Sequence, residues 1–225
     1  MKKNNVELSN KPFEIKDCAL AALATGKSAQ NLKELRDLLL DIDANSIYYH
    51  FWGGQLKPRF DDPEYHNDFA SWTRHALHDG TLAERLSAID PTDFQNLEDL
   101  RTEIVEIIEE RLDENDHIPW CEPDEKFHFV TSQIVVFNTK KTIEDPRMLV
   151  KTIPNMTRSS IFYHFIDARR RTPENIDDFR AWLKGFDGQY NFLCDMISTI
   201  DPFFATLTEL RKHLYNIVKN YFEGE

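Results

Sequence analysis

Hydrophobic and polar positions follow two kinds of pattern along this chain. Apolar residues recur every three or four positions over residues 32–42, 69–76 and 97–108, and again over 179–186 and 207–218. This spacing is typical of amphipathic helices. Residues 127–137 are instead rich in aromatic and β-branched side chains, which favours a strand. The pattern therefore predicts many helices and few strands.

The order of these patterns repeats. Ser46-Ile47-Tyr48-Tyr49-His50-Phe51 returns as Ser160-Ile161-Phe162-Tyr163-His164-Phe165. Further matches keep the same order with small shifts in register, and they include Phe13 with Phe127, Thr25 with Thr139, Leu35 with Leu149, Asp68 with Asp178, Trp72 with Trp182, and Leu100 with Leu210. We infer two tandem copies, residues 13–112 and 127–222, joined by a charged, proline-containing linker over residues 113–126.

Local signals mark where the predicted elements begin. Asn31 and Asp145 occupy equivalent places and are predicted to cap helices, and a short helix is predicted to begin after Ser46 and Ser160. Residues 18–23 resemble a helix when taken alone. Their equivalence with the strand of the second copy favours a strand instead.

Each copy is thus one strand followed by several helices, and a lone strand leaves an unpaired edge. We expect the two strands to pair with each other. The predicted fold is α+β and mainly α, with the copies related by a pseudo-two-fold axis around a small shared sheet in one compact domain. Two independent domains on the linker are the alternative arrangement.

Composition and charge narrow the class of protein. The 225 residues are 41% hydrophobic and 12% aromatic, which is enough for a buried core. A net charge of −12 argues against a general nucleic-acid partner, and no apolar run is long enough to span a membrane. The widely spaced Cys18, Cys121 and Cys194 fit reduced thiols. We expect a cytoplasmic protein whose partner is a small molecule or another protein, and the oligomeric state stays open.

The repeated motif is the first candidate for chemistry. Apolar residues surround the helix predicted around His50, so His50 and His164 are expected among aromatic side chains. If the two helices meet, these imidazoles and the adjacent Tyr49 and Tyr163 line one pocket suited to acid–base work. The alternative is structural, with each histidine bonded to backbone or to the other copy.

A cationic cluster follows His164. Arg169, Arg170 and Arg171 come directly after Asp167, and three guanidinium groups can clamp a phosphate or a carboxylate. The alternative is that nearby carboxylates neutralise them. No spacing matches a phosphate-binding loop or a metal site, so no cofactor and no metal are expected.

The chain also resembles a known family in several segments. These segments are Ala24-Thr25-Gly26, residues 46–52, residues 63–69, Ile89-Asp90-Pro91 and residues 165–173. Together they resemble a bacterial family classed as a domain of unknown function, over roughly residues 13–222. The resemblance implies a link with carbohydrate metabolism, and it carries no established catalytic residues.

The leading hypothesis is a binding or accessory protein that holds a small anionic or sugar-like ligand between its two copies. The candidate ligand-binding residues are Tyr49, His50, Tyr163, His164, Asp167, Arg169, Arg170 and Arg171. Two hypotheses stay open beside it. One is a hydrolase or isomerase that uses a buried histidine as general acid or base, and the other is a protein-interaction scaffold with a broad exposed apolar patch.

Overall fold

The computed structural model describes residues 11–57, 64–114 and 123–224. Two long strands, β1 (Phe13–Ala29) and β2 (Phe127–Ile143), form a two-stranded antiparallel sheet. The predicted pairing of the two strands is confirmed. Residues 18–23 lie within β1, because pairing with β2 overrides their helical propensity.

The helices that follow β1 begin close to the predicted places. They are α1 (Leu32–Leu39), α2 (Ala44–Leu56), α3 (Asp68–His75), α4 (Gly80–Ser87) and α5 (Leu97–Glu114). Asn31 caps α1, because its side chain accepts a hydrogen bond of 2.8 Å from the amide of Glu34. The predicted apolar stripe of α5 is buried at Leu100, Ile104 and Ile108.

The segment after β2 is more finely divided. It contains the 3₁₀ turns η2 (Pro146–Met148) and η3 (Ile153–Asn155), the short helices α6 (Leu149–Thr152), α7 (Arg158–Ile161) and α8 (Ala168–Arg171), the π-helical segment η4 (Phe162–Asp167), and the helices α9 (Asp178–Lys184), α10 (Asn191–Ser198) and α11 (Leu207–Glu223). Asp145 caps η2, as predicted. A Thr206–Glu209 capping box begins α11.

One prediction about helix starts is wrong. Helix α2 is capped by Asp43 and α7 by Thr157, so Ser46 and Ser160 lie inside the first turn. Their hydroxyl groups bond elsewhere, as described below. Helices α4 and α10 were not predicted.

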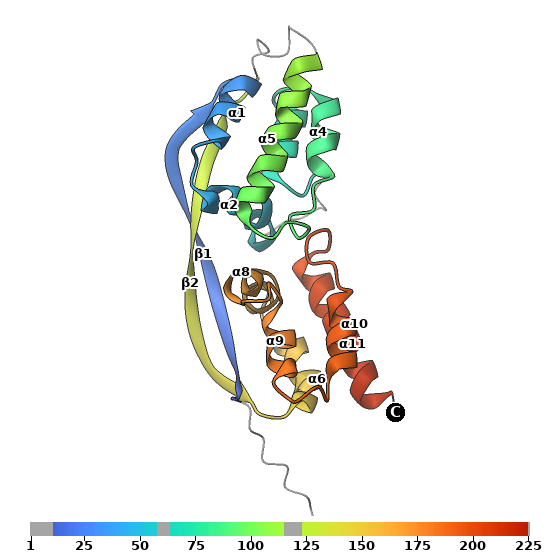
Figure 1. Cartoon of the computed structure of the whole chain (residues 1–225). Coiled ribbons are helices and arrows are strands. Elements are labelled where there is room, and N and C mark those ends of the chain that lie inside the picture. Colours follow the sequence, from blue (N-terminus) through green and yellow to red (C-terminus); the bar gives the residue numbers. More distant parts are fainter. Residues whose placement is uncertain (1–10, 58–63, 115–122, 225) are drawn as a thin grey trace, which may run out of the picture. The chain divides into compact units, whose positions relative to one another are not determined.

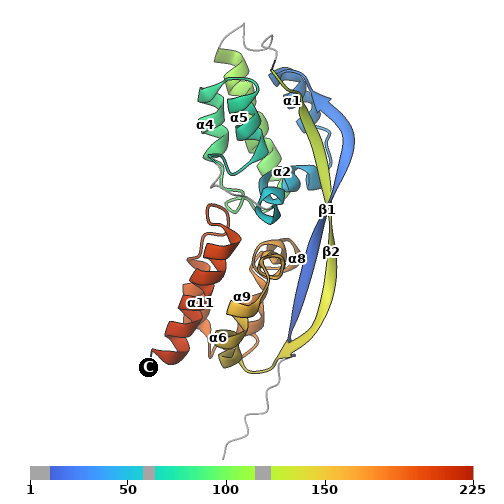
Figure 2. The same cartoon turned by 180° about the vertical axis from the view of Figure 1, so that it is seen from behind.

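The described chain forms two compact units whose boundaries fall inside the strands. The N-terminal unit is Leu20–Val135, and the C-terminal unit combines residues 11–19 with residues 136–224. Within the N-terminal unit the helices lie along one side of the strand pair (Figure 1). The same holds within the C-terminal unit, as the view from behind also shows (Figure 2). Residues 115–122 of the predicted linker lie outside the described residues.

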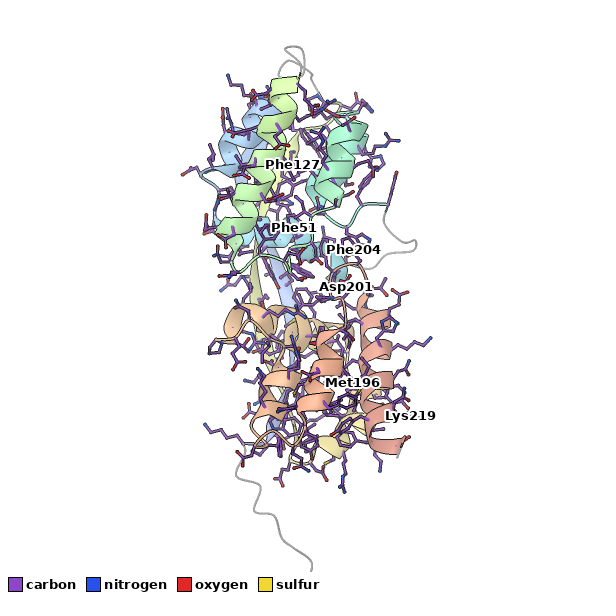
Figure 3. All side chains as sticks on the ribbon, turned by 45° about the vertical axis from the view of Figure 1, so that its right-hand side comes forward. Phe51, Phe127, Met196, Asp201, Phe204 and Lys219 are labelled. Carbon is purple, nitrogen blue, oxygen red and sulfur yellow. The ribbon has the colours of Figure 1, made fainter. Side chains whose placement is uncertain are left out.

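Each unit builds its core around an aromatic residue from the start of a strand. In the N-terminal unit, Phe127 stacks on Phe69 with ring centroids 5.1 Å apart, and Figure 3 shows Phe127 among the helices. In the C-terminal unit, Phe13 stacks on Phe179 at 5.2 Å. Thus the helices of each predicted copy bury a strand residue that belongs to the other copy.

Cys18 and Cys194 are free and buried, whereas Cys121 lies outside the described residues. No helix in residues 11–57, 64–114 and 123–224 combines the length and the apolar character needed to cross a membrane.

Candidate functional site

The repeated motif attaches a helix to the edge of the sheet. In the N-terminal unit the hydroxyl of Ser46 donates to the carbonyl of Val130 at 2.8 Å, and the amide of Val130 donates to Nε2 of His50 at 3.1 Å. Ser46 and His50 lie one helical turn apart on the same face of α2. Two side chains therefore satisfy both backbone groups of one strand residue, as a neighbouring strand would.

The same arrangement recurs in the C-terminal unit. Ser160 Oγ donates to the carbonyl of Lys16 at 2.7 Å, and the Lys16 amide donates to His164 Nε2 at 2.9 Å. His50 and His164 are only 4% and 2% exposed. Both histidines are thus buried next to a strand edge.

The second ring nitrogen of each histidine is also engaged. Nδ1 of His50 lies 2.9 Å from Asp68 Oδ2, and Nδ1 of His164 lies 2.7 Å from Asp178 Oδ2. Nε2 of each histidine accepts a hydrogen bond from a backbone amide and therefore carries no proton. The hydrogen-bond network thus assigns the ring proton to Nδ1, which donates to the carboxylate. Neither imidazole retains a nitrogen for exchanging protons with a substrate. This geometry favours the structural interpretation of the motif.

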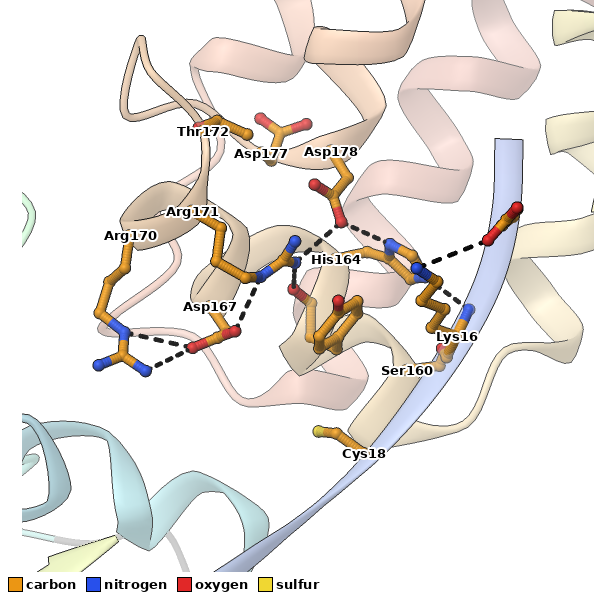
Figure 4. A network of polar contacts seen from close by, with 12 residues as sticks. Lys16, Cys18, Ser160, His164, Asp167, Arg170, Arg171, Thr172, Asp177 and Asp178 are labelled. Atoms are coloured by element: carbon orange, nitrogen blue, oxygen red, sulfur yellow. Dashed lines mark hydrogen bonds and ion pairs between the residues drawn. The ribbon is translucent and has the colours of Figure 1, made fainter. Parts of the chain in front are cut away.

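Two of the three arginines, Arg170 and Arg171, bond to carboxylates in the C-terminal unit (Figure 4). Asp167 is 3% exposed and accepts from Arg170 Nη2 at 2.8 Å and from Arg171 Nε at 3.0 Å. Nη2 of Arg171 also donates to Asp178 at 3.0 Å. Burial opposes the charge of Arg171, but the carboxylates of Asp178 and Asp167 outweigh it and raise the pKa of this guanidinium.

The π-helical segment η4 is part of this network. The amide of Ala168 donates to the carbonyl of Tyr163, five residues back, and the same carbonyl accepts from Arg171 Nη2 at 2.9 Å. A side chain that inserts into the helical ladder in this way accounts for the widened turn. It also fixes Arg171 over the ring of Tyr163, with its guanidinium carbon 4.0 Å from the centroid.

A recess of about 480 Å³ opens beside this network in the C-terminal unit. Aromatic side chains are among its lining residues, and the indole of Trp182 donates to the carbonyl of Lys11 at 2.9 Å. The residues that line it are Lys11, Pro12, Phe13, Glu14, Lys16, Thr142, Tyr163, His164, Arg171, Asp178 and Trp182. The recess thus joins the start of β1 to helices of the second predicted copy.

A recess of about 530 Å³ occupies the equivalent place in the N-terminal unit. Trp72, the equivalent of Trp182, lines this recess and donates to the carbonyl of Glu125 at 2.7 Å. Its lining residues are His50, Asp68, Ser71, Trp72, His75, Ala76, Asp124, Glu125, Lys126, Phe127 and His128. One lysine and three carboxylates line this recess, whereas three cationic and two anionic side chains line the other.

Comparison with known proteins assigns the family. The model of a family of unknown function, DUF5752, matches residues 10–219. The chain belongs to this family. No curated protein matches it at a significant level. The chain is also similar to the solved structure of OrfY from Thermoproteus tenax, with 26% identity and a TM-score of 0.82 over 95% of this chain and 96% of that chain.

In this DUF5752 chain the eight predicted site residues divide between the two units. Tyr49 and His50 belong to the N-terminal unit, and the other six belong to the C-terminal unit. Of those six, Tyr163, His164 and Arg171 line the C-terminal recess. Asp167 and Arg170 form the ion pair behind it, and Arg169 lies over the ring of Phe165 at 5.5 Å.

Sequence reasoning missed the part of the recess that comes from the strands. Lys11, Lys16 and Thr142 lie in or next to β1 and β2, far from the motif in sequence. A signal was present in the repeat itself. Lys11 and Lys16 stand where the second copy has Glu125 and Val130, so the two copies differ in charge at matched positions.

The described residues also bear on metal and thiol chemistry. Within the described ranges, no group of three His, Cys, Asp or Glu side chains is arranged to hold a metal ion. Burial, followed by the nearby carboxylates of Asp167 and Asp17, raises the pKa of Cys18 to about 12. Cys18 is thus a protonated thiol, and its Sγ lies 3.3 Å from the carbonyl of Ser159.

Proposed function

We propose that this protein is a binding or accessory protein that holds a small anionic or sugar-like ligand in the recess of the C-terminal unit. The observation that carries the proposal is the lining of that recess. Cationic Lys11, Lys16 and Arg171 meet there with Tyr163 and Trp182, in a chain whose net charge is −12. The ligand contacts residues of both predicted copies.

We propose binding and not acid–base catalysis because both ring nitrogens of each histidine are already hydrogen-bonded within the protein. A general acid or base needs a nitrogen that faces the substrate, and the partners of His164 occupy both. The histidine instead holds Asp178 and the strand in place, which gives the recess a rigid wall.

Binding can be tested with matched tyrosine variants. Tyr163→Phe removes one hydroxyl from the C-terminal recess, and Tyr49→Phe removes the equivalent hydroxyl in the N-terminal unit. We expect a member of a panel of sugars, sugar phosphates, nucleotides and organic acids to raise the melting temperature. Calorimetry should then show weaker binding for Tyr163→Phe than for Tyr49→Phe. A panel without any stabilising compound would count against the proposal.

One observation favours a second candidate function, a protein-interaction scaffold. On β2, the consecutive residues Val135, Val136 and Phe137 are 43%, 44% and 50% exposed. Exposed apolar side chains in a row on a strand are typical of interaction surfaces. Sedimentation of the wild type and of Phe137→Ser over a range of concentrations tests self-association. A strictly monomeric wild type would exclude a scaffold that acts by self-association.

We also infer that the chain arose by internal duplication, as its repeated sequence predicts. Support comes from matched contacts: Ser46, His50 and Asp68 make the same set of hydrogen bonds as Ser160, His164 and Asp178. A bacterial, cytoplasmic setting belongs to the same proposal and rests on the sequence resemblance and the cysteine pattern.

A further inference from the structure

The C-terminal recess contains hydrogen-bond donors that the protein itself leaves unused. Arg171 uses Nε and Nη2 for Asp167, Asp178 and the Tyr163 carbonyl. Its Nη1 makes no hydrogen bond with any residue that the structure describes. Because three bonds already fix the guanidinium plane, a ligand that binds Nη1 immobilises no additional side chain.

The hydroxyl of Tyr163 gives a second and independent indication. Tyr163 is only 6% exposed, yet its hydroxyl bonds to none of the residues in the described ranges. Burial raises the pKa of Tyr163, so the hydroxyl keeps its proton and acts as a donor. The ring of Tyr163 is buried, but its hydroxyl is not among the buried side-chain atoms without a partner in the described ranges, so it is open to the recess that Tyr163 lines. A ligand in this recess can accept a hydrogen bond from it.

Lys16 adds a positive charge to the same wall. Its Nζ lies 3.5 Å from Glu14, beyond a short hydrogen bond, and its side chain is about one-third exposed. The backbone of Lys16 is held separately by His164 and Ser160. The strand therefore places the Lys16 backbone beside the recess, and its ammonium group forms only a long ion pair with the exposed Glu14.

The equivalent recess of the N-terminal unit shows that this charge pattern does not follow from the fold. Glu125 replaces Lys11 and Val130 replaces Lys16 in the alignment of the two copies. Asp68, Asp124 and Glu125 line that recess, with Lys126 as its lysine. Two sites of similar geometry therefore present opposite charge to a ligand.

From the unused donors and this contrast, we infer that the C-terminal recess binds an oxyanion group, a phosphate or a carboxylate, carried by a small molecule. Arg171 Nη1 and Lys16 Nζ supply the charged hydrogen bonds, and the Tyr163 hydroxyl supplies a neutral one. The N-terminal recess does not take this ligand. The inference rests on the proposed function and selects the anionic class from its two ligand classes.

Calorimetry on the full chain with glucose, gluconate and glucose 6-phosphate tests this inference. The three probes share a carbon skeleton and differ in the anionic group, so they separate a carboxylate from a phosphate. We expect one site per chain for at least one of the anions and at least about tenfold weaker binding of glucose. Binding of the anion should weaken as salt rises from about 0.05 M to about 0.5 M.

Two lysine variants locate the site. Lys16→Val introduces the residue that the second copy has there and keeps the backbone bonds to His164 and Ser160. We expect it to weaken anion binding about tenfold or more, whereas Lys126→Met in the other recess changes it by less than about twofold. Circular dichroism confirms that both variants are folded.

The outcomes separate this inference from the proposed function. Glucose that binds as tightly as its anionic analogues would overturn the inference and leave a sugar-binding role standing. Anion binding that depends on Lys126 and not on Lys16 would also overturn it. If no compound of the larger panel binds to the wild type, the inference and the proposed function both fail.

Discussion

Ser46 and His50 act together on a single strand residue. Their side chains complete the hydrogen bonding of Val130, and Asp68 then holds the imidazole from its other side. His50 also contacts Phe127 and Phe69, with ring centroids 4.8 Å and 5.3 Å away. Removal of this side chain thus affects hydrogen bonding and packing together.

We predict that His50→Ala lowers the free energy of unfolding by about 3 kcal/mol, since it leaves a cavity and an unsatisfied Val130 amide. Denaturant titration followed by circular dichroism measures the change. His213→Ala, at an exposed position of α11, is the control and should change stability by less than about 0.5 kcal/mol. Equal losses for the two variants would contradict the structural role of His50.

Cys18 gives a prediction that depends on pH. Its pKa rises from 9.0 to about 12 on folding, so the unfolded chain loses this proton first. The contribution of Cys18 to stability is therefore complete below pH 9 and falls as the pH rises from 9 toward 12. Cys18→Ala should reduce the loss of stability over this window in alkaline denaturation curves. An unchanged pH dependence would show that the thiol is not buried as described.

Reactivity offers a second measurement on the same thiol. With its pKa raised to about 12, Cys18 carries far less thiolate in the folded protein at pH 8 than in the unfolded chain. Alkylation mapped by mass spectrometry should therefore be far slower at Cys18 in the native chain than in urea. Rapid labelling of the native protein at this residue would be the contrary result.

At the scale of an element, η4 is organised by a buried carboxylate. Asp167 at its end is bonded to Arg170 and Arg171, and Arg171 reaches back to the Tyr163 carbonyl. In α2 the aligned position is Gly53, and α2 continues as a regular helix. The widened turn thus accompanies the acidic side chain and its two arginines.

Asp167→Ala is predicted to destabilise the protein by about 1.5–3 kcal/mol, because it removes the buried carboxylate that accepts charged hydrogen bonds from the partly exposed Arg170 and Arg171. The exposed pair of Glu174 and Lys184 supplies the control, and Glu174→Ala should cost less than about 1 kcal/mol. Chemical denaturation of the two variants compares them. A small effect for Asp167→Ala would mean that water replaces the carboxylate without penalty.

At the scale of the whole molecule, the unit boundaries do not follow the predicted copies. The N-terminal unit takes Phe127 and Phe129 from the start of β2, and the C-terminal unit takes Phe13 and Ile15 from the start of β1. Each unit is therefore incomplete unless both strands are present.

We predict that fragments 1–114 and 115–225 fold poorly alone and regain helical structure when mixed. Each fragment lacks strand residues that its helices bury, whereas fragment 20–135 contains the complete N-terminal unit and serves as the control. Circular dichroism and gel filtration follow the mixing. Stable folding of fragment 1–114 by itself would contradict the exchange of strands.

Several features were predictable because they depend on local sequence. The apolar periodicity over α5 and α11 indicated helices. Asn31 and Asp145 are the N-cap residues at the predicted places. The apolar residues around His50 indicated that its side chain is buried. The pairing of β1 with β2 followed from the physical cost of a lone strand edge. The sequence by itself thus determined the fold class and the burial of the repeated motif.

The partners of these elements were decided only by the tertiary structure. The strand predicted at residues 127–137 does not show which helices bury Phe127. Ser46 resembles a cap in the sequence, and only the structure shows its bond to Val130. The recess depends on Lys16 meeting Tyr163 and Arg171 across about 150 positions of sequence. Such long-range contacts depend on which helices each strand packs against, and no local pattern encodes that choice.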